Sequence, residues 1–191
     1  RDVAPSRGLG DVYKRQEVEG LLKLFRQYLK RCIKKAHKNQ MRVKIIGDPS
    51  AFPQDIQDSI HELEECSKDY DHMYFQIAMN YGSRDEILRG MTRMIEDVKN
   101  GTLAENAFDE NGKLTEQCFE SYLDTAGIPD PDLLIRTSGE QRLSNYLMWQ
   151  LAYTEFYFTE VPWPDFHEEE LRKAIEQYNN RDRRYGGVKE E

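Results

Sequence analysis

An arginine-rich and hydroxyl-rich segment follows a short apolar run in the last third of the chain. It reads Ile135-Arg136-Thr137-Ser138-Gly139-Glu140-Gln141-Arg142-Leu143-Ser144-Asn145. Guanidinium groups stay charged and bind phosphate oxygens in pairs, and a glycine lets backbone N–H groups approach an anion. The segment therefore predicts a cradle for a diphosphate. A surface loop in which Arg136 pairs with Glu140, and Ser144 caps the next helix, fits the same residues equally well.

Glu155 is a second candidate, because it lies in the aromatic stretch Trp149–Phe158. A buried carboxylate needs a cation or strong hydrogen-bond donors, since burial without a partner is costly. A Mg²⁺ ion that bridges Glu155 and a diphosphate meets this need, because Mg²⁺ takes few carboxylates and shares its shell with phosphate oxygens and water. An ion pair with a nearby arginine meets it as well, and both interpretations stay open.

A third candidate is Asn80-Tyr81-Gly82-Ser83-Arg84, which follows an apolar run and precedes a helical pattern. Helix N-termini can bind anions, although a plain capping turn explains this segment equally well. The four histidines show no metal-ligand spacing, so we expect ordinary roles for them. The chain has no P-loop, G-x-S-x-G, G-x-G-x-x-G or D-D-x-x-D sequence, so hydrolase, NTPase, dinucleotide-binding and trans-prenyl synthase functions lack their usual support.

The first element that must position these residues is a helix predicted over residues 17–38. Its apolar residues recur at spacings of three and four. They are Val18, Leu21, Leu22, Phe25, Leu29, Cys32, Ile33 and Ala36. The outer face carries Lys23, Arg26, Lys30, Arg31, Lys34, Lys35 and Lys38. Such a face can serve anionic lipid or nucleic acid, and we interpret it as a solvated face.

A strand and a second helix are predicted next. The strand covers residues 43–46 and ends in the turn Gly47-Asp48-Pro49, and Pro53 is expected as the first residue of the helix. The inner face of this helix is formed by Ile56, Ile60 and Leu63. The largely apolar run Met73–Met79 then predicts a strand that is buried on both faces of a parallel sheet.

A third helix is expected to begin with a capping box of Ser83 and Glu86 and to end at Asn100-Gly101. Its predicted inner face is Ile87, Met91, Met94, Ile95 and Val98. A short helix over residues 115–123 and a strand over residues 132–135 follow. The alternation predicts an α/β fold with a central, mostly parallel β-sheet flanked by helices, in which ligands bind just after the strands.

Length and charge limit the classes of function. The 191 residues suit one domain, which we place at residues 17–191, and we exclude residues 1–16 as a non-native or disordered tail. With 27 Lys and Arg against 35 Asp and Glu, the net charge of −8 argues against a general nucleic-acid or membrane binder. Three widely spaced cysteines and the lack of a long apolar run favour a soluble, cytoplasmic protein.

Seven ordered segments of this chain resemble the cis-prenyltransferase family, the undecaprenyl diphosphate synthases. They are Val43–Asp48, Asn80–Ile87, Asp132–Glu140, Arg142–Asn145, Trp149–Phe158, Trp163–Phe166 and Arg183–Gly187. The resemblance implies an enzyme that adds isopentenyl diphosphate, in cis geometry and with Mg²⁺, to an allylic diphosphate such as farnesyl diphosphate. The product would be a polyprenyl diphosphate such as undecaprenyl diphosphate, delivered to a membrane at whose periphery the enzyme works.

The resemblance also implies roles for particular residues. By matching position, Arg136, Arg142 and Ser144 bind isopentenyl diphosphate and Glu155 holds Mg²⁺. Arg184 and Gly186 belong to the family's arginine-x-glycine motif, which helps to close the site. The family is typically dimeric, so we expect a homodimer and no nucleic-acid partner.

One part of the family pattern is missing from these residues. The family begins with a strand that carries methionine, aspartate, glycine, asparagine, glycine and arginine, and its aspartate is central to catalysis. The segment Asp109-Glu110-Asn111-Gly112-Lys113 is only superficially similar, because no buried strand precedes it. We therefore expect the first strand or strands of the sheet to be missing, half of the site to be present, and little or no turnover.

Two other functions stay open. One is a catalytically silent partner subunit of a heteromeric cis-prenyltransferase, against which the retention of Arg136, Arg142, Ser144 and Glu155 argues. The other is an anion-binding module without catalysis, which binding of diphosphates without metal dependence would favour.

Overall fold

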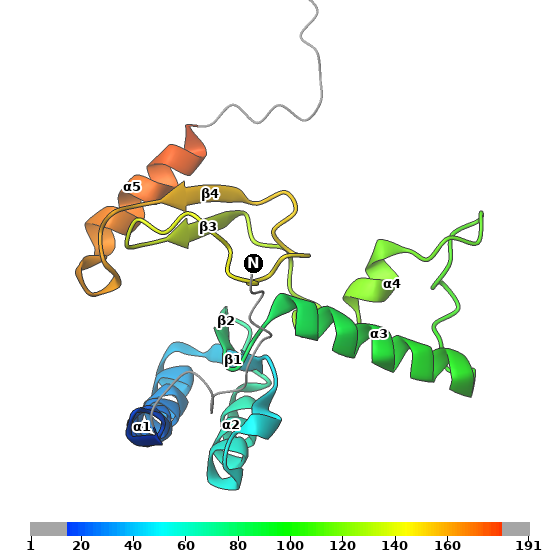
Figure 1. Cartoon of the computed structure of the whole chain (residues 1–191), viewed down its shortest axis with the longest axis horizontal. Helices are drawn as coiled ribbons and strands as arrows, with labels where there is room; N and C mark the ends of the chain where they lie inside the picture. Colours follow the sequence, from blue (N-terminus) through cyan, green and yellow to red (C-terminus); the bar gives the residue numbers. More distant parts are fainter. Residues whose placement is uncertain (1–14, 181–191) are drawn as a thin grey trace, which may run out of the picture. The chain divides into compact units, whose positions relative to one another are not determined.

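Figure 1 shows the computed structural model of the chain, which describes residues 15–180. Its contacts divide the chain into two compact units, Arg1–Ala126 and Gly127–Glu191. The single domain expected over residues 17–191 stays a prediction. Residues 1–14 of the predicted tail lie outside the described residues, whereas residues 15 and 16 belong to the first helix.

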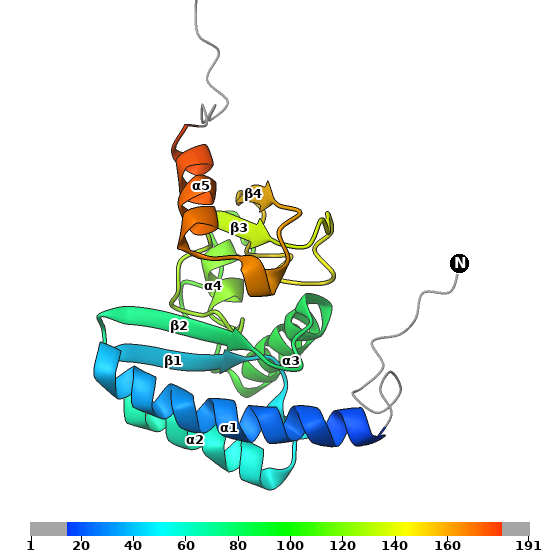
Figure 2. The same ribbon diagram turned by 90° about the vertical axis from the view of Figure 1, so that its left-hand side faces the viewer.

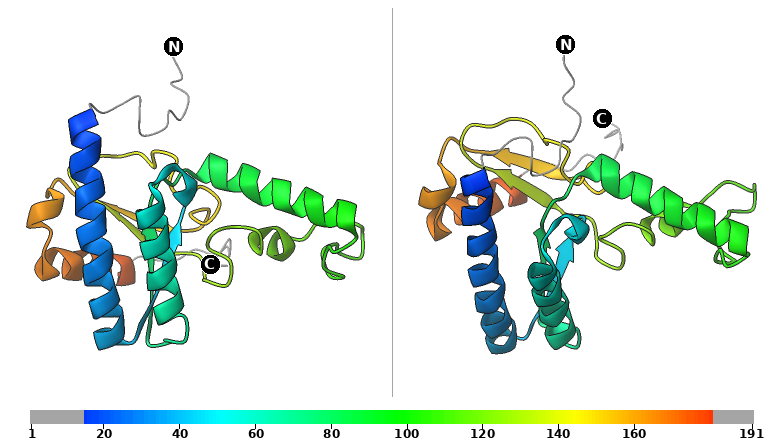
Figure 3. Two further views of the ribbon diagram at one scale, coloured as in Figure 1. Left: turned by 90° about the horizontal axis from the view of Figure 1, so that it is seen from below. Right: turned by 60° about the horizontal axis from the view of Figure 1, so that its bottom comes forward.

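In the first unit, two helices cover one face of a parallel pair of strands (Figure 2). The strands are β1 (Met41–Ile46) and β2 (Met73–Ala78), and the helices are α1 (Arg15–Asn39) and α2 (Gln54–Ser67). The helices lie side by side (Figure 3). All four elements occur where the sequence predicts them. The strands can run parallel because α2 forms the crossover connection between them.

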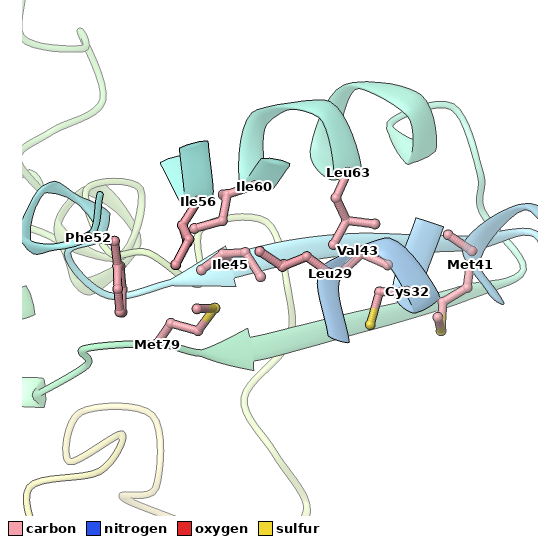
Figure 4. Close-up of a cluster of buried hydrophobic side chains, with 11 residues drawn as sticks. Leu29, Cys32, Met41, Val43, Ile45, Phe52, Ile56, Ile60, Leu63 and Met79 are labelled. Atoms are coloured by element: carbon pink, nitrogen blue, oxygen red, sulfur yellow. The ribbon is translucent and has the colours of Figure 1, made fainter. Parts of the chain in front are cut away.

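The core of the first unit lies between β1 and the two helices (Figure 4). Successive side chains of a strand point to opposite faces, so Met41, Val43 and Ile45 face the helices, whereas Arg42 and Lys44 do not. The helices contribute Leu29, Cys32, Ala36, Ile56, Ile60 and Leu63, all at most 5% exposed. Each large aliphatic side chain buried in this way contributes about 1.5–3 kcal/mol, so this packing dominates the unit's stability.

The connection from β1 to α2 depends on a glycine. Gly47 has a φ of +114°, and a Cβ atom there would lie 2.2 Å from the carbonyl oxygen of Met79. Only glycine permits this close approach. Asp48 then caps the 3-10 helix η1 (Pro49–Ala51). Pro53 is the N-cap residue of α2 instead of its first residue, because its carbonyl accepts the first bonds of the helix.

β2 is less buried than its sequence predicts. The exposed fraction is 53% for Met73, 50% for Tyr74 and 37% for Phe75. The predicted burial on both faces is wrong, because among the described residues β2 pairs with β1 alone and is an edge strand. Unpaired edges with apolar side chains favour association with other chains.

The next helix, α3 (Ser83–Asn100), does not begin with the predicted capping box. Its N-cap residue is Gly82, and no side chain caps it. Glu86 is fully buried, and its carboxylate accepts hydrogen bonds from the Tyr81 hydroxyl and the Asp124 N–H. The predicted capping box is wrong because the N-cap residue is Gly82, so Ser83 is already the first residue of the helix.

The end of α3 and the following helix agree with the sequence. Gly101 adopts a left-handed φ of +69° and donates its N–H to the Val98 carbonyl, which stops α3 as predicted. The predicted helix over residues 115–123 is the shorter α4 (Glu116–Glu120), whose N-cap Thr115 accepts from the Cys118 N–H.

The predicted inner face of α3 is mostly exposed. The exposed fractions are 42% for Met91, 47% for Ile95 and 55% for Val98. Leu88, which was not part of the predicted face, is 63% exposed beside them. The predicted burial is wrong for Met91, Ile95 and Val98, because no described element of the first unit covers this side of the helix. The four residues, spaced at i, i+3, i+7 and i+10, form what we call the α3 stripe.

A buried polar network ties α3 to the end of β1. Asp124 accepts two hydrogen bonds from the Arg89 guanidinium, at 2.8 and 3.0 Å, and a third from the Gly47 N–H at 2.9 Å. The Lys44 ammonium donates to the Asp124 carbonyl at 2.6 Å. The network holds the segment after α4 against the end of β1 and the start of α3, because Glu86 of α3 also accepts from the Asp124 N–H.

The second unit contains a further parallel pair and one helix. The strands are β3 (Leu133–Arg136), where the sequence predicts it, and β4 (Glu155–Phe158), which the sequence analysis did not predict. The unpredicted α5 (Glu168–Asn179) has three glutamates in its first turn, where they stabilise the helix dipole. The Tyr178 hydroxyl donates to the Asp132 carboxylate at 3.1 Å, which fixes α5 beside the start of β3.

The predicted α/β class is thus confirmed, with parallel strand pairs and flanking helices. The described strands pair as β1–β2 in the first unit and β3–β4 in the second. Among the described residues, no helix is both long and apolar enough to cross a bilayer.

Replacing Asp124 by asparagine tests the polar network. Burial by itself raises the pKa of the Asp124 carboxyl, but hydrogen bonds from Arg89 and Gly47 and the charges of Arg89 and Arg93 outweigh it and lower the pKa. A lowered pKa contributes stability above the unfolded pKa of about 3.9, and this stability is lost as the pH falls through the folded pKa. We expect Asp124→Asn to lower the free energy of unfolding by about 2–3 kcal/mol at pH 7.

The measurement is urea denaturation at pH 7 and at pH 3. Asp85→Asn is the matched control, because Asp85 also pairs with Arg89 but its side chain is 55% exposed. The control should cost less than about 1 kcal/mol. An Asp124→Asn deficit that is equally large at both pH values would contradict the assignment.

Candidate functional site

The candidate site lies in the connection between β3 and β4. Parallel strands need a crossover connection, which is usually a helix. Here residues 137–154 contain only turns and bends. Connections longer than about 12–15 residues without secondary structure are uncommon and are usually functional or disordered. This connection is ordered and leaves the carboxyl end of β3, where parallel sheets bind ligands.

Three of the predicted site residues meet in this connection. Arg136, the last residue of β3, donates from its guanidinium to the Arg142 carbonyl and, at 3.3 Å, to the Ser144 hydroxyl. The alternative pairing of Arg136 with Glu140 is not what the structure records, because Glu140 pairs with Arg142. Ser144 caps no helix and instead accepts from Arg136. Arg136, Arg142 and Ser144 therefore form one cluster.

A cavity of about 210 Å³ opens beside this cluster. Its lining residues are Leu134, Ile135, Arg136, Arg142, Leu143 and Tyr146. The lining combines aliphatic side chains with two arginines, so a ligand with an anionic head and an apolar tail fits its chemistry.

Tyr146 is the lining residue that sequence reasoning missed. Burial raises the pKa of its phenol, so the hydroxyl stays protonated at neutral pH and can donate a hydrogen bond. The sequence signal that could have indicated Tyr146 is its position directly after Ser144-Asn145. In the structure the next residue, Leu147, is buried.

The backbone of the connection is unusual. Residues other than glycine with positive φ are concentrated here: they are Ser138, Ser144, Asn145 and Leu147. Such conformations are sparsely populated, and they persist only where the surroundings enforce them, often at ligand sites. The fold thus holds the cluster in a fixed shape.

Gly139 has a different role from the predicted one. The N–H groups of Ser138 and Gly139 donate to the carbonyls of Val161 and Thr159, so they do not face a ligand. A Cβ atom on Gly139 would lie 2.4 Å from the Glu160 carboxylate. Glycine is favoured here because the residue has a left-handed φ of +69°. The groups of the cluster that remain for an anion are its side chains.

Glu155 lies apart from the cluster formed by Arg136, Arg142 and Ser144. It is the first residue of β4 and pairs in register with Leu133, whereas Arg136 pairs with Phe158 at the other end of the strands. At about 3.3 Å per residue, their Cα atoms are offset by roughly 10 Å along the strands. Glu155 is partly buried, and its N–H donates to the Asp132 carbonyl at 3.0 Å.

The remaining predicted candidates lie elsewhere. Arg184 and Gly186 lie outside the described residues. In the first unit, Asn80 has a φ of +48° and its side chain donates to the Asp48 carbonyl, so this segment forms a turn before α3. Asp109 accepts from the N–H groups of Asn111 and Lys113 in an exposed turn.

Residues 15–180 contain no group of three or more His, Cys, Asp or Glu side chains that could hold a metal ion. A divalent ion can also be held by one or two carboxylates together with ligands from a phosphate substrate and water. Mg²⁺ suits that arrangement, since it commonly takes one or two carboxylates together with phosphate oxygens and water. Glu155 can supply one such carboxylate.

Comparisons of the sequence and of the structure with known proteins give the same result. The prenyltransferase family described as "Putative undecaprenyl diphosphate synthase" matches residues 13–186. The isoprenyl transferase of Clostridium perfringens is 49% identical over 173 residues, which cover 91% of this chain and 66% of that protein. The isoprenyl transferase of Fusobacterium nucleatum is 48% identical over 91% of this chain and 70% of its own length. The chain therefore spans about two thirds of the length of these relatives.

Two solved structures share the fold. Lavandulyl diphosphate synthase from Lavandula x intermedia, solved with dimethylallyl diphosphate, is 36% identical, with a TM-score of 0.80 over 92% of this chain and 74% of its own. A probable undecaprenyl diphosphate synthase from Campylobacter jejuni is 31% identical, with a TM-score of 0.75 over 91% of this chain and 76% of its own. The arginine cluster after β3 and these matches identify the chain as a member of the undecaprenyl diphosphate synthase family of prenyltransferases.

Proposed function

We propose that this chain is the isopentenyl-diphosphate-binding part of a cis-prenyltransferase. The observation that carries the proposal is the convergence of Arg136, Arg142 and Ser144 beside a cavity lined by both arginines and by aliphatic side chains. Isopentenyl diphosphate has a doubly charged head and a short apolar tail, which match these two kinds of lining residue. The family membership supports the same substrate class.

In the proposed binding mode, the guanidinium groups of Arg136 and Arg142 hold the diphosphate and the Ser144 hydroxyl donates to it. When the diphosphate binds, the Arg142 guanidinium exchanges Glu140 for it. The ion pair with Glu140 can be given up because it is exposed, and exposed ion pairs contribute little to stability. Positioning of isopentenyl diphosphate by fixed cations lowers the barrier to its attack on an allylic carbon.

The proposed reaction breaks the bond between the allylic carbon and its diphosphate and joins that carbon to the double bond of isopentenyl diphosphate, which then loses a proton. The allylic substrate proposed is a prenyl diphosphate such as farnesyl diphosphate. Lavandulyl diphosphate synthase, solved with dimethylallyl diphosphate, supports an allylic diphosphate as the class. Mg²⁺, held in part by Glu155, would neutralise charge on the departing diphosphate.

The family's aspartate-bearing motif does not occur in these 191 residues. We therefore expect the chain by itself to show little or no incorporation of labelled isopentenyl diphosphate onto farnesyl diphosphate. The same chain joined to the N-terminal segment of the Clostridium perfringens relative should show incorporation that EDTA abolishes and Mg²⁺ restores. Full activity of the 191-residue chain alone would contradict the half-site, and silence of a folded extended chain would favour the silent partner subunit.

Arg136→Ala in the extended chain removes one of the two guanidinium groups. Each charged hydrogen bond lost is worth about 1.5–3 kcal/mol, so we expect KM for isopentenyl diphosphate to rise roughly 10- to 100-fold. The exposed Arg172→Ala is the matched control, because Arg172 pairs with Glu168 on α5. Steady-state kinetics with varied isopentenyl diphosphate measure the effect.

Glu155→Gln should behave differently from Arg136→Ala. The carboxylate is lost but the shape is kept, so the Mg²⁺ concentration for half-maximal activity should rise, with a smaller change in KM for isopentenyl diphosphate. If the two variants have the same effects, Glu155 has no separate role with the metal.

We also propose that the chain associates as a homodimer through the α3 stripe. Leu88, Met91, Ile95 and Val98 are each more than 40% exposed, and they follow a heptad-like spacing that suits packing against a second helix. An apolar face of this kind is a common interaction site in proteins.

Sedimentation of Met91→Lys/Ile95→Lys tests the dimer, since two buried charges at an interface are strongly unfavourable. We expect the double variant to sediment as a monomer at micromolar concentration. Glu96→Lys changes the net charge by the same amount on the neighbouring surface of α3 and should stay dimeric. A double variant with an unchanged mass would contradict the stripe as the interface.

A further inference from the structure

The charges of the chain are strongly segregated. Helix α1 contains eight Lys and Arg against two Glu, a net charge of +6. The whole chain carries −8, so all other residues together carry −14. One helix therefore has the opposite sign to the rest of the protein.

The basic side chains of α1 lie on its exposed side. The buried residues Leu29, Cys32 and Ala36 pack into the core and fix which face points away from it. The basic residues classed as exposed are Lys23, Lys30, Arg31, Lys34, Lys35 and Lys38. We call these six, with Leu24 and Tyr28, the α1 outer face. Figure 2 shows α1 along its whole length beside α2.

Nearby carboxylates neutralise little of the positive charge of the α1 outer face. Among the described side chains of α1, the structure records an ion pair for Arg26 alone, with Asp55. Arg26 is less exposed than the six residues of the outer face. The positive field of the face is therefore available to a partner. From Lys23 to Lys38 the face extends over roughly 23 Å at 1.5 Å per residue.

Two apolar side chains lie within this basic face. Leu24 is 60% exposed and Tyr28 is 45% exposed, and their spacing of four residues places them together on the helix. A leucine gains nothing from a phosphate surface, but it gains free energy when it enters an apolar medium. The combination of lysines with an apolar pair is the pattern of helices that lie at the surface of a bilayer.

We propose that the α1 outer face docks on the surface of an anionic lipid bilayer. The lysines contact lipid phosphates, and Leu24 and Tyr28 enter the boundary between headgroups and acyl chains. The net charge of −8 does not prevent this contact, because screening limits electrostatic interactions to about 8 Å at physiological ionic strength. Only the charges on the face that meets the membrane count at that range.

A single-stranded RNA is the competing partner for a basic face. Leu24 distinguishes the two, since RNA offers bases for stacking on aromatic rings but no apolar medium for an aliphatic side chain. Lysine also accounts for five of the six exposed cations, whereas base recognition favours arginine. The observations therefore favour the bilayer.

Vesicle flotation tests the proposal. The probes are vesicles of phosphatidylcholine alone and of phosphatidylcholine with 30 mol% phosphatidylglycerol, in 0.1 M and 0.5 M salt. The proteins are the 191-residue chain and the extended chain described above, so that aggregation of one does not decide the result. We expect binding to the anionic vesicles alone, reduced at 0.5 M salt.

Lys30→Gln/Lys34→Gln/Lys35→Gln should weaken the partition coefficient by roughly a hundredfold, at about fivefold for each basic residue at the surface. Lys68→Gln/Lys99→Gln/Lys113→Gln changes the net charge equally, on exposed residues elsewhere in the first unit, and should bind as the unchanged protein does. Leu24→Ser should weaken binding by up to about tenfold. Circular dichroism confirms that the variants keep their helices.

Equal losses in the two triple variants would overturn the proposal, because net charge alone would then explain binding. Equal binding to both vesicle types would overturn it too, since apolar adhesion through β2 or the α3 stripe would then suffice. Tighter binding to a 20-nucleotide RNA than to vesicles, lost in the α1 triple variant, would assign the face to RNA instead.

Discussion

Parallel pairing of strands is the constraint on which both units depend. The carboxyl end of the first strand must be connected to the amino end of the second, so each pair needs a long crossover. In the first unit the crossover contains α2, which closes the core with α1. In the second unit the crossover is the turn-rich connection of residues 137–154. The same geometric requirement thus leads to a helix-covered hydrophobic core in the first unit and to the arginine cluster in the second.

Buried carboxylates hold further parts of the first unit in place. Glu86 is fully buried and Asp124 is partly buried, and each carboxylate accepts from more than one donor. These bonds fix the segment after α4 and the start of α3 relative to the strand ends. The arginine cluster of the second unit is different, since its guanidinium groups remain partly exposed and hold weak or exchangeable partners. The first arrangement gives stability, and the second leaves charge available for a ligand.

The candidate site could be predicted only in part. The sequence alone indicated Arg136, Arg142 and Ser144, because they follow an apolar strand at short spacing. The part played by Gly139 was not, because the N–H groups of Ser138 and Gly139 bond to carbonyls twenty or more residues away in the sequence. The position of Glu155 at the opposite end of the strand pair likewise required the register of β3 and β4. The capping box at Ser83 failed because the N-cap residue of α3 is Gly82, one residue earlier.

The sequence by itself determined the family and most of the local elements, although β4 and α5 were not predicted from it. Periodicity in the apolar residues specifies α1, α2 and the first three strands, since each pattern acts through neighbours along the chain. It could not determine which apolar faces are covered, and it assigned Met91, Ile95, Val98 and the whole of Met73–Met79 to the interior. Burial depends on which elements pack together, and only the tertiary structure shows that β2 has one described partner and that the α3 stripe has none in its unit.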